Sequence, residues 1–324
     1  MHLKNGLSRR SFMVGSVSLL GLAGCARAES SVTQDSSESA ARVTVRGDGF
    51  ESTIPRDPAR VVVMEGRGDL EFALLAGYPL VATGNTAAPG SLPAGQYDGR
   101  IGRDVQSIGG PDGPSIEEVS ALAPDLIVMR ANGWRLDWYG NELLSQVAPV
   151  LPVEVNEPDF RAQMSSQFDA LGRGSDAAVL LDAYDTTVAD ARSELGDALV
   201  GRRIALVTSE PAAKGYVNLW TNQIGTTVAR DLGLDVLYFD PADEKGNQQL
   251  SLENLSSLAD ADYIFHQTTD PAVVGAAGTW QALPAVAEGR TAVLDPRLNN
   301  GLVITASAIA DTIAGSIGSW TRAS

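Results

Sequence analysis

The sequence predicts an α/β protein of two lobes, each with a parallel-type sheet, joined by a long helical spine. Short apolar, β-branched runs alternate with helical patterns before residue 160, and the same alternation resumes after residue 200. Between them, residues 160–195 contain no strand-like run, and their apolar residues recur at helical spacing. Because strands that alternate with helices pair in parallel, each lobe is expected to hold a parallel sheet.

The first lobe is expected to begin with a small hairpin, because residues 42–55 alternate around an Asp48-Gly49 turn signal. The run RVVVM (60–64) follows as a strand, and the helical pattern DLEFALLAG ends on Gly77. A long Gly/Pro-rich stretch leads to the short helix SIEEVSALA, with Ser115 as its N-cap. Further elements of this lobe are strands at 79–84, 124–130 and 150–155 and a helix over WYGNELLSQVA.

The spine and the second lobe follow the same reasoning. Gly172 to Gly174 are expected to break the helical stretch, which is long for one globular helix. In the second lobe we expect strands at 203–210, 235–240, 262–268 and 291–295, and helices at 224–232, over LENLSSLA and WQALPAVAEG, and at 303–317. The predicted domains are an N-terminal lobe (42–157), a linking helical spine (158–196) and a C-terminal lobe (197–324).

The N-terminus has the composition of an export signal. An apolar run ends at Gly24 and follows Lys4, Arg9 and Arg10, and it is shorter than the ~20 residues that a membrane span needs. Residues 22–25 resemble a bacterial lipobox, so we expect a signal peptide at 1–24 and a lipid on Cys25, the only cysteine of the chain. Residues 8–13 also resemble a twin-arginine signal, and the export route stays open. The small, polar residues 25–41 are expected to form a flexible tether.

The charge of the chain excludes some partners. Its formal net charge is −16, and loss of the three basic residues of the signal makes the remainder more acidic. A nucleic-acid binder needs the opposite sign, so no nucleic-acid partner is expected. Anionic lipid would also repel the folded part, so membrane attachment would depend on the lipid at Cys25.

Five segments in order resemble one known family. They are RVVV with DLEFALLAG and PLV, then PSIEEVSALAPDLIV, then SLENLSSLADADYIF, then WQALPAVAEGR, and then TAVLD. Together they are similar to the solute-binding lipoproteins that serve ABC importers of ferric siderophores, haem and cobalamin. The resemblance covers residues 42–320.

The resemblance implies a fold and a function. The family has two lobes joined by one long helix, opens and closes little, and binds its ligand in a cleft between the lobes. It implies a monomer that is lipid-anchored on the outer face of the cytoplasmic membrane. This protein would capture an iron(III)-siderophore complex and deliver it to an ABC permease dimer with its ATPase. Neither a catalytic activity nor a resident cofactor is expected.

Two glutamates are candidates for permease docking. Glu117 and Glu253 occupy equivalent positions, each just inside a short helix that precedes a buried strand. The resemblance implies that these positions form salt bridges to arginines on the permease. The same positions also suit acids in a first helical turn, and Glu118 adjoins the first of them.

Candidate ligand residues lie where strands are expected to end. A chelate cleft needs apolar walls and a few cations, because catecholate and carboxylate complexes are anionic whereas hydroxamate complexes are near-neutral. Aromatic residues in such loops can equally anchor their own loops. Trp280 and Trp320 are expected in the core. The candidates are Arg67, Arg130, Trp134, Tyr139, Tyr216, Trp220, His266 and Arg297, with Arg135, Trp138 and Gln267 beside them.

The same sequence fits other ligands and other kinds of site to different degrees. Haem or cobalamin would suit the same cleft, with His266 and a tyrosine such as Tyr216 as conceivable axial haem ligands. A non-transport surface lipoprotein on this fold also stays open. Zinc-binding relatives need several histidines, and only His266 follows the signal. Residues 66–71 lack the third glycine of a dinucleotide-binding turn, since Glu71 stands in its place.

Overall fold

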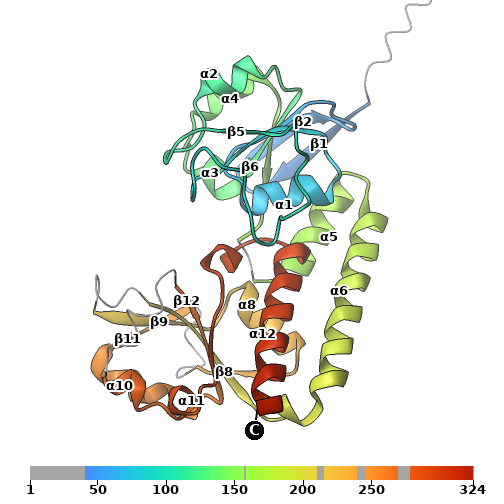
Figure 1. Ribbon diagram of the computed structural model, residues 1–324. Coiled ribbons are helices and arrows are strands. Elements are labelled where there is room, and N and C mark those ends of the chain that lie inside the picture. The colour runs from blue at the N-terminus through green and yellow to red at the C-terminus, as the bar shows by residue number, and fades with distance from the viewer. Residues whose placement is uncertain (1–40, 157, 210–214, 239–245, 269–277, 324) are drawn as a thin grey trace, which may run out of the picture. The chain divides into compact units, whose positions relative to one another are not determined.

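The computed structural model describes residues 41–156, 158–209, 215–238, 246–268 and 278–323 (Figure 1). These residues belong to one compact unit, Ala40–Ser324. The predicted signal peptide, Cys25 and most of the tether lie outside the described residues.

The N-terminal lobe is built on a five-stranded parallel sheet in the order β5-β4-β3-β6-β7. Its central strands β3 and β6 are apolar runs that are buried on both faces, which is why they are visible in the sequence. The antiparallel hairpin of β1 and β2 precedes the sheet, as predicted from Asp48-Gly49. The strands are β1 (Arg42–Gly47), β2 (Phe50–Pro55), β3 (Val61–Val63), β4 (Leu80–Gly84), β5 (Gln106–Ile108), β6 (Leu126–Arg130) and β7 (Val150–Val153).

The helices of this lobe agree with the sequence patterns, except that the short helix α3, like the short strand β5, was not predicted. The hydroxyl of Ser115 accepts a hydrogen bond from the Glu118 N–H, and the Glu118 carboxylate accepts one from the Ser115 N–H, so Ser115 is the N-cap as predicted. Neither β5 nor α3 was predicted, because β5 has three residues inside a Gly/Pro-rich stretch and α3 begins with an Asn-Gly pair that is typical of turns. The helices are α1 (Gly68–Leu75), α2 (Ile116–Ala121), α3 (Ala131–Arg135) and α4 (Asn141–Val147).

The helical spine consists of two helices, α5 (Phe160–Ala170) and α6 (Gly174–Leu195), followed by the 3₁₀ turn η1 (Gly196–Ala198). The predicted break is confirmed at Gly172, whose φ of +72° ends α5. The expectation of a single connecting helix is therefore too simple. The C-terminal helix α12 (Val303–Ala323) packs side by side with α6 and runs beyond the predicted end at residue 317 (Figure 1).

The sheet of the C-terminal lobe is mixed: the expected parallel pairing holds for β8, β12 and β13, and antiparallel strands extend the sheet at one edge. The order is β11-β9-β8-β12-β13; β12 pairs in parallel with both β8 and β13, whereas β9 is antiparallel to β8 and β11. Because β9 occupies the edge of β8 from Leu206 onward, β10 can pair only with Arg203 and Ile204, which shortens the strand predicted at 235–240. The strands are β8 (Arg203–Ser209), β9 (Tyr216–Trp220), β10 (Asp235–Val236), β11 (Asn247–Ser251), β12 (Tyr263–Gln267) and β13 (Thr291–Val293).

The helices of the C-terminal lobe are short apart from α12. The predicted helix over LENLSSLA is a 3₁₀ helix, and its leucines recur every three residues, the period at which 3₁₀ side chains align. Leu255 and Leu258 are buried on that side. Besides α12, the elements are α8 (Ile224–Asp231), η2 (Leu252–Asp260), α10 (Gly278–Gln281), α11 (Pro284–Ala287) and η3 (Pro296–Asn299).

A buried carboxylate ties the two lobes together. Glu71 of α1 is fully buried and accepts hydrogen bonds from the backbone N–H groups of Ile304 (2.7 Å) and Thr305 (3.1 Å) in the first turn of α12, and from the Thr305 hydroxyl (2.5 Å). The Gly301 N–H donates to the Val155 carbonyl at 2.9 Å. A side chain at Gly301 would collide with Glu71 and Thr305. We call these four groups (Glu71, Gly301, Ile304 and Thr305) the interlobe clamp; it fixes the start of a C-lobe helix on an N-lobe helix.

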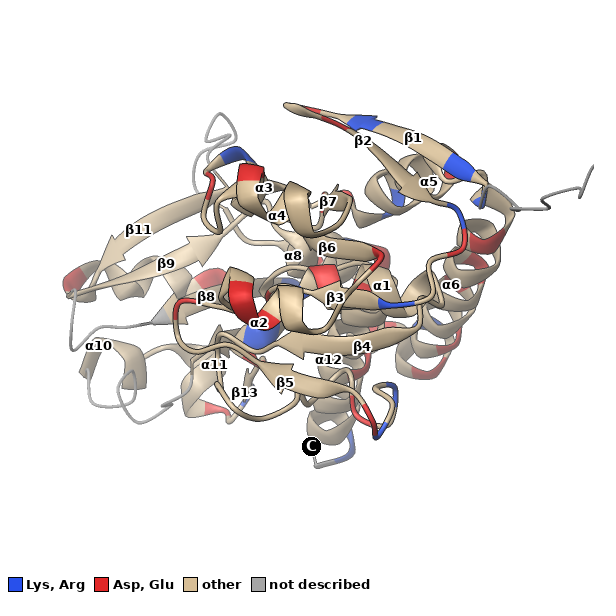
Figure 2. Cartoon of the chain, turned by 90° about the horizontal axis from the view of Figure 1, so that it is seen from above, with Lys and Arg blue, Asp and Glu red and all other residues tan. Residues whose placement is uncertain are grey.

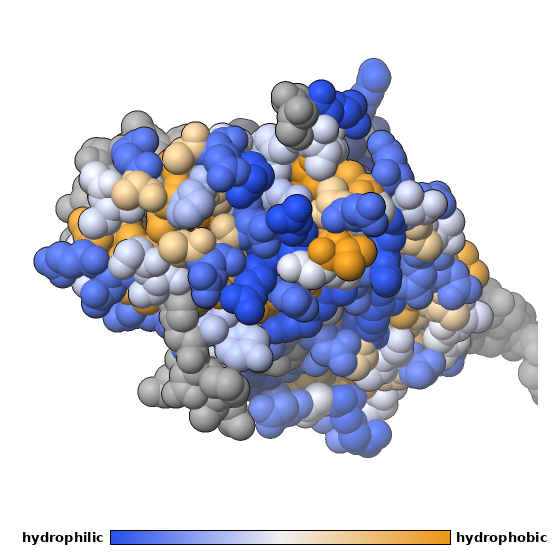
Figure 3. Space-filling view, turned by 90° about the horizontal axis from the view of Figure 1, so that it is seen from below, coloured by the Kyte–Doolittle hydropathy of each residue, from blue (hydrophilic) through white to orange (hydrophobic). Residues whose placement is uncertain are grey.

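The surface is acidic and carries apolar residues in small patches. Acidic residues lie along α6 and on α2 (Figure 2). The face seen from below shows hydrophobic residues scattered among hydrophilic ones (Figure 3). Among the described residues, no helix combines the length and apolar character needed to cross a membrane.

Candidate ligand-binding cleft

A cavity of about 820 Å³ lies between the lobes, where parallel strands of both sheets end. The N-terminal lobe contributes the residues that follow β3 and β4, and the C-terminal lobe contributes those that follow β12 and β13. Loops at the carboxyl ends of parallel strands are the usual ligand sites of open α/β sheets. We call this space the interlobe cavity; its polar lining residues include Arg67, Asn85, Gln96, Tyr97, Thr268, Asp295 and Arg297.

The turn from β3 into α1 requires two glycines. Gly66 has a φ of +69°, and a Cβ there would collide with the carbonyl of Gly84. A Cβ on Gly68 would lie 2.6 Å from the Val155 side chain. The Gly66-Arg67-Gly68 pattern is therefore explained by close packing of this turn, and Glu71, in the third glycine position, serves the interlobe clamp.

A buried group of charges lies at this turn. Glu65 is 1% exposed and Arg130, the last residue of β6, is 7% exposed. Glu65 Oε2 accepts from Arg130 Nε at 2.5 Å and also from its Nη2. Asp69 is fully buried, and its carboxylate accepts from the N–H groups of Glu65, Arg67 and Leu70 at 2.8–3.0 Å. We call Glu65, Arg67, Asp69 and Arg130 the cleft-side cluster; it holds two acids and two arginines.

Burial changes the protonation behaviour of this cluster. It raises the pKa of Glu65 to about 7, with a further contribution from the charge of Asp69 and an opposing one from Arg130. Burial also raises the pKa of Asp69 and, together with the charge of Arg130, lowers that of Arg67. The Oε1 atom of Glu65 has no hydrogen-bond partner within the described parts of the chain. The cluster is thus balanced in charge but sensitive to proton uptake.

Aromatic residues cover the cluster. The Arg130 guanidinium lies 5.5 Å from the ring centroid of Trp138, which is 46% exposed. Tyr139 is half-buried, and burial together with the charge of Glu65 raises its pKa. Trp138 therefore presents an aromatic face to solvent with a paired arginine behind it.

Arg67 and Arg297, two of the predicted ligand residues, meet at the interlobe cavity. Arg67 Nη2 donates to the Asn299 side-chain oxygen at 2.7 Å, across the two lobes. Arg297 is paired with Asp295: its Nε lies 2.9 and 3.0 Å from the two carboxylate oxygens, and hydrogen bonds from Arg297 lower the pKa of Asp295.

Two predicted ligand residues lie elsewhere. The indole of Trp134 donates to the Gly49 carbonyl at 3.2 Å and packs beside the β1–β2 hairpin, so Trp134 anchors that hairpin. His266 is buried, with its ring edge-on to Trp280 at 6.0 Å, because the alternation of β12 points it to the face that α10 covers. Burial lowers the pKa of His266. Neither residue is among those that line the interlobe cavity.

Tyr216 and Trp220 lie in strand β9 and not in a loop, which corrects a second expectation. Trp220 is half-buried against the main core, and its indole donates to the Thr208 hydroxyl at 3.1 Å. Tyr216 is half-buried at the opposite end of β9. Of the tryptophans expected in the core, Trp280 is buried, and Trp320 stacks on Tyr263 with ring centroids 5.5 Å apart.

Glu65 and Asp69 are the main site residues that the sequence analysis missed. Glu65 could have been identified from the sequence, because it is a charged residue directly after the buried run VVVM, where a parallel strand ends. Asp69 resembles an ordinary acid of a first helical turn, and nothing local distinguishes it from one.

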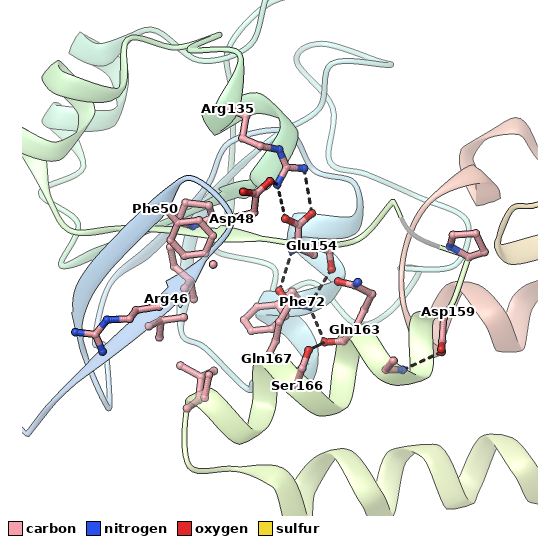
Figure 4. A pocket seen from close by; sticks show the side chains of 18 of the residues that line it. Arg46, Asp48, Phe50, Phe72, Arg135, Glu154, Asp159, Gln163, Ser166 and Gln167 are labelled. Carbon is pink, nitrogen blue, oxygen red and sulfur yellow. Dashed lines mark hydrogen bonds and ion pairs between the residues drawn. The ribbon is translucent and has the colours of Figure 1, made fainter. Parts of the chain in front are cut away.

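A second cavity, of about 860 Å³, lies between the β1–β2 hairpin and α5 (Figure 4). Arg135 Nη1 lies 2.5 Å from Glu154 Oε1 within the cavity (Figure 4), and Arg46 Nε lies 2.8 Å from Glu51 of the hairpin, outside the lining. Gln167 is held by the backbone of Glu154. We interpret this cavity as the space beside the contacts that attach the hairpin to the rest of the lobe.

The predicted docking glutamates are both exposed, each the second residue of a helix that follows a serine. The adjoining Glu118 is engaged in capping, and hydrogen bonds from Ser115 and Gly109 lower its pKa. No hydrogen bond or ion pair to Glu117 or Glu253 occurs in the described ranges. Nor do these ranges contain a group of three or more residues able to hold a metal ion.

Comparison with known proteins identifies the family. Residues 61–298 match the model of a periplasmic binding protein family. The iron(3+)-hydroxamate-binding protein FhuD of Bacillus subtilis is 26% identical over 287 residues, covering 86% of this chain and 87% of the relative.

Solved structures share the fold. The Fe³⁺-Desferal-bound siderophore-binding protein FhuD of Vibrio cholerae has a TM-score of 0.65 at 21% identity, covering 80% of this chain and 97% of that one. PiaA of Streptococcus pneumoniae in complex with ferrichrome has a TM-score of 0.62 at 18% identity, covering 86% and 99%. The chain belongs to the periplasmic binding protein family, a family of binding proteins.

Proposed function

We propose that this protein is an extracytoplasmic solute-binding protein that captures a ferric siderophore of the near-neutral hydroxamate class and delivers it to an ABC permease dimer with its ATPase. The observation that carries the ligand class is the state of Arg67 and Arg297, which line the interlobe cavity, and of Arg130 beside Arg67. Arg130 is paired with Glu65, Arg297 with Asp295, and Arg67 donates to the neutral amide of Asn299.

Charge balance favours a near-neutral ligand. A polyanionic catecholate complex would need cations that are not already compensated, since anion binding depends on unpaired positive charge. The described wall of the cleft offers arginines that face carboxylates or an amide. A hydroxamate complex needs hydrogen-bond donors and apolar area but little net charge, and this wall supplies both.

The size and lining of the interlobe cavity suit a chelate. Its volume of about 820 Å³ falls in the range of ~300–1,000 Å³ that is usual for ligand pockets. Leu92, Pro93 and several alanines provide apolar area beside the polar groups. We propose that Arg67, Arg130, Tyr139 and Arg297, with Trp138, form the binding wall, and that Tyr216 and Trp220 contribute from β9.

The relatives support the same ligand class. One is named for iron(3+)-hydroxamate binding, and two proteins of the same fold bind Fe³⁺-Desferal and ferrichrome in their solved structures. A haem-binding role receives less support, because His266, the candidate axial ligand, is buried against Trp280.

Delivery would use Glu117 and Glu253, whose exposed carboxylates are available to arginines of a permease. Lysine at both positions should abolish uptake and leave ligand affinity intact. A wild-type rate of transport by the double variant would remove this assignment.

Export and anchoring are proposed from the N-terminal sequence: a signal at 1–24, a lipid on Cys25 and a tether to residue 41. Cys25→Ala should release the protein from the membrane fraction. We also propose that it acts as a monomer, as the family resemblance implies.

Titration of the purified protein tests the proposed function. Tryptophan fluorescence is followed against a neutral ferric tris-hydroxamate, a polyanionic ferric tris-catecholate, haem and cobalamin. Tightest binding of the hydroxamate is the expected result. Preference for the catecholate, haem or cobalamin would overturn the proposed ligand class.

A further inference from the structure

This inference rests on the proposed function and concerns how the cleft distinguishes one chelate class from another. We propose that Glu65 is a specificity-determining residue: its buried carboxylate neutralises Arg130, so that the cleft accepts near-neutral chelates and rejects polyanionic ones.

Glu65 is held in the geometry that this role needs. It directly follows Met64 at the end of the buried strand β3, and its side chain is 1% exposed. One carboxylate oxygen receives both Nε and Nη2 of Arg130. Glu65 and Arg130 are buried as an ion pair. Such a pair keeps its orientation, because separating the partners would leave a buried charge without compensation.

The other buried acids of this region are engaged elsewhere. The Asp69 carboxylate accepts three backbone N–H groups of the turn 65–70. Glu71 points to the start of α12. Asp69 still feels the charge of Arg130, but within the described structure Glu65 is the acid that hydrogen-bonds to the Arg130 guanidinium.

The charge of the pair would reach a ligand in the interlobe cavity through Arg67, which lines the cavity and feels the charges of Arg130 and Glu65, while Trp138 covers Arg130 on its solvent side. The Arg130 guanidinium lies 5.5 Å from the ring centroid of Trp138, which is half exposed, so a ligand on the outer face of this ring would be separated from that cation by the indole alone. Arg67 belongs to the same cluster and lines the interlobe cavity. Removal of the Glu65 charge would leave Arg130 as an uncompensated cation behind the aromatic wall.

The test is the ratio of two affinities measured on the full chain. Wild type and Glu65→Gln are titrated by tryptophan fluorescence at pH 8 and low salt with the neutral tris-hydroxamate and the polyanionic tris-catecholate. Glutamine keeps an acceptor for Arg130 and removes the charge. The ratio should shift toward the catecholate by about ten- to thirty-fold, the effect of one unit charge at roughly 8 Å in a partly polar medium. Salt should reduce the shift.

Two variants make the test specific. Glu154→Gln removes an equal charge from the Arg135 pair beside the hairpin, and it should leave the ratio unchanged. Glu65→Gln combined with Arg130→Gln removes both charges, and it should return the ratio to the wild-type value. The readout is a ratio, so a general loss of binding by itself does not imitate the expected shift.

The outcomes separate the inference from the function on which it rests. An unchanged ratio in Glu65→Gln, with hydroxamate binding retained, would overturn the inference and leave the proposed function standing. An equal shift in Glu154→Gln would assign the effect to net charge and not to Glu65. If Glu65→Gln does not fold, the double variant decides: a ratio far from the wild-type value contradicts the inference. Absence of binding of either chelate to wild type would remove both proposals.

Discussion

Two buried acidic residues, Glu65 in the turn before α1 and Glu71 within α1, differ in what they face. In the cleft-side cluster, Glu65 accepts hydrogen bonds from the long side chain of Arg130. In the interlobe clamp, Glu71 accepts from the backbone N–H groups and a hydroxyl of the first turn of α12. Both carboxyls have a raised pKa because both are buried.

The difference in partners separates structure from recognition. A carboxylate at a helix N-terminus satisfies donors that have no partner within the helix and interacts favourably with its dipole, so Glu71 holds two lobes in one relative position. In the role proposed above, a carboxylate on Arg130, the neighbour of the cavity-lining Arg67, would change the local charge that a ligand meets. The same residue type would then support the frame in one place and adjust binding in the other.

Removal of the clamp carboxylate should have the largest effect. Glu71→Ala leaves the Ile304 and Thr305 donors without their acceptor and opens a void between the lobes. We expect a loss on the order of 3–5 kcal/mol in the free energy of unfolding. Urea denaturation followed by circular dichroism measures it, and Glu71→Gln, which keeps one acceptor, should lose less than half as much.

A Glu71→Ala variant with wild-type stability would contradict the structural role assigned to Glu71, since the clamp would then not hold the lobes. Gly301→Ala is an independent check at the same place. Its new methyl group would collide with Glu71 and Thr305 and should also destabilise the protein.

The second prediction concerns stability against pH. The pKa of Glu65 is raised from 4.5 to about 7 in the folded protein, so the native state binds more protons than the unfolded state between these values. The free energy of unfolding should therefore fall as the pH rises from about 4.5 to 7, by about 2–3 kcal/mol from this group.

Glu65→Gln should flatten the stability curve by that amount. The charged and titratable groups around Glu65 are Arg67 and Asp69 on its own turn, Arg130 from β6 and Tyr139. Asp69 and Glu71 also have raised pKa values, so only the difference between wild type and variant isolates Glu65. Denaturation curves at four pH values supply it, and parallel curves would contradict the assigned pKa.

The sequence revealed the frame of the protein better than its contacts. Strands β3 and β6 are continuous apolar runs because both faces of a parallel sheet are covered, and such runs are visible without a structure. Strand β11 reads NQQLS and has no such signal. The neighbouring β9, YVNLW, alternates with period two, and that pattern was available but was assigned to a loop.

The site resisted prediction for a different reason. Glu71 and Ile304 are 233 positions apart, and Glu65 and Arg130 are 65 apart. A single sequence contains no information that pairs such residues. Arg67 and Arg297 were found because charged residues after buried strands collect at one edge of a sheet. Trp134 was expected at the cleft because it follows a buried strand. It anchors the β1–β2 hairpin instead, and nothing in the sequence distinguishes these two roles.

The smallest expected effect concerns Trp134 and Trp138, the two tryptophans that follow β6. Trp138 is 46% exposed above Arg130, whereas Trp134 is packed beside the hairpin and hydrogen-bonded to Gly49. Covering the exposed part of Trp138 with a ligand should contribute about 1–2 kcal/mol by apolar area. Trp138→Ala should therefore weaken hydroxamate binding about tenfold and cost at most about 1 kcal/mol of stability from the lost cation–π contact.

Trp134→Ala should show the reverse, with a lower free energy of unfolding and an unchanged affinity, because its indole supports the hairpin and not the cleft. Fluorescence of the remaining tryptophans measures affinity, and urea denaturation measures stability, on the same two variants. If Trp134→Ala weakened binding as much as Trp138→Ala, the hairpin side would be part of the binding wall. The cleft-side cluster would then no longer mark the place where the ligand lies.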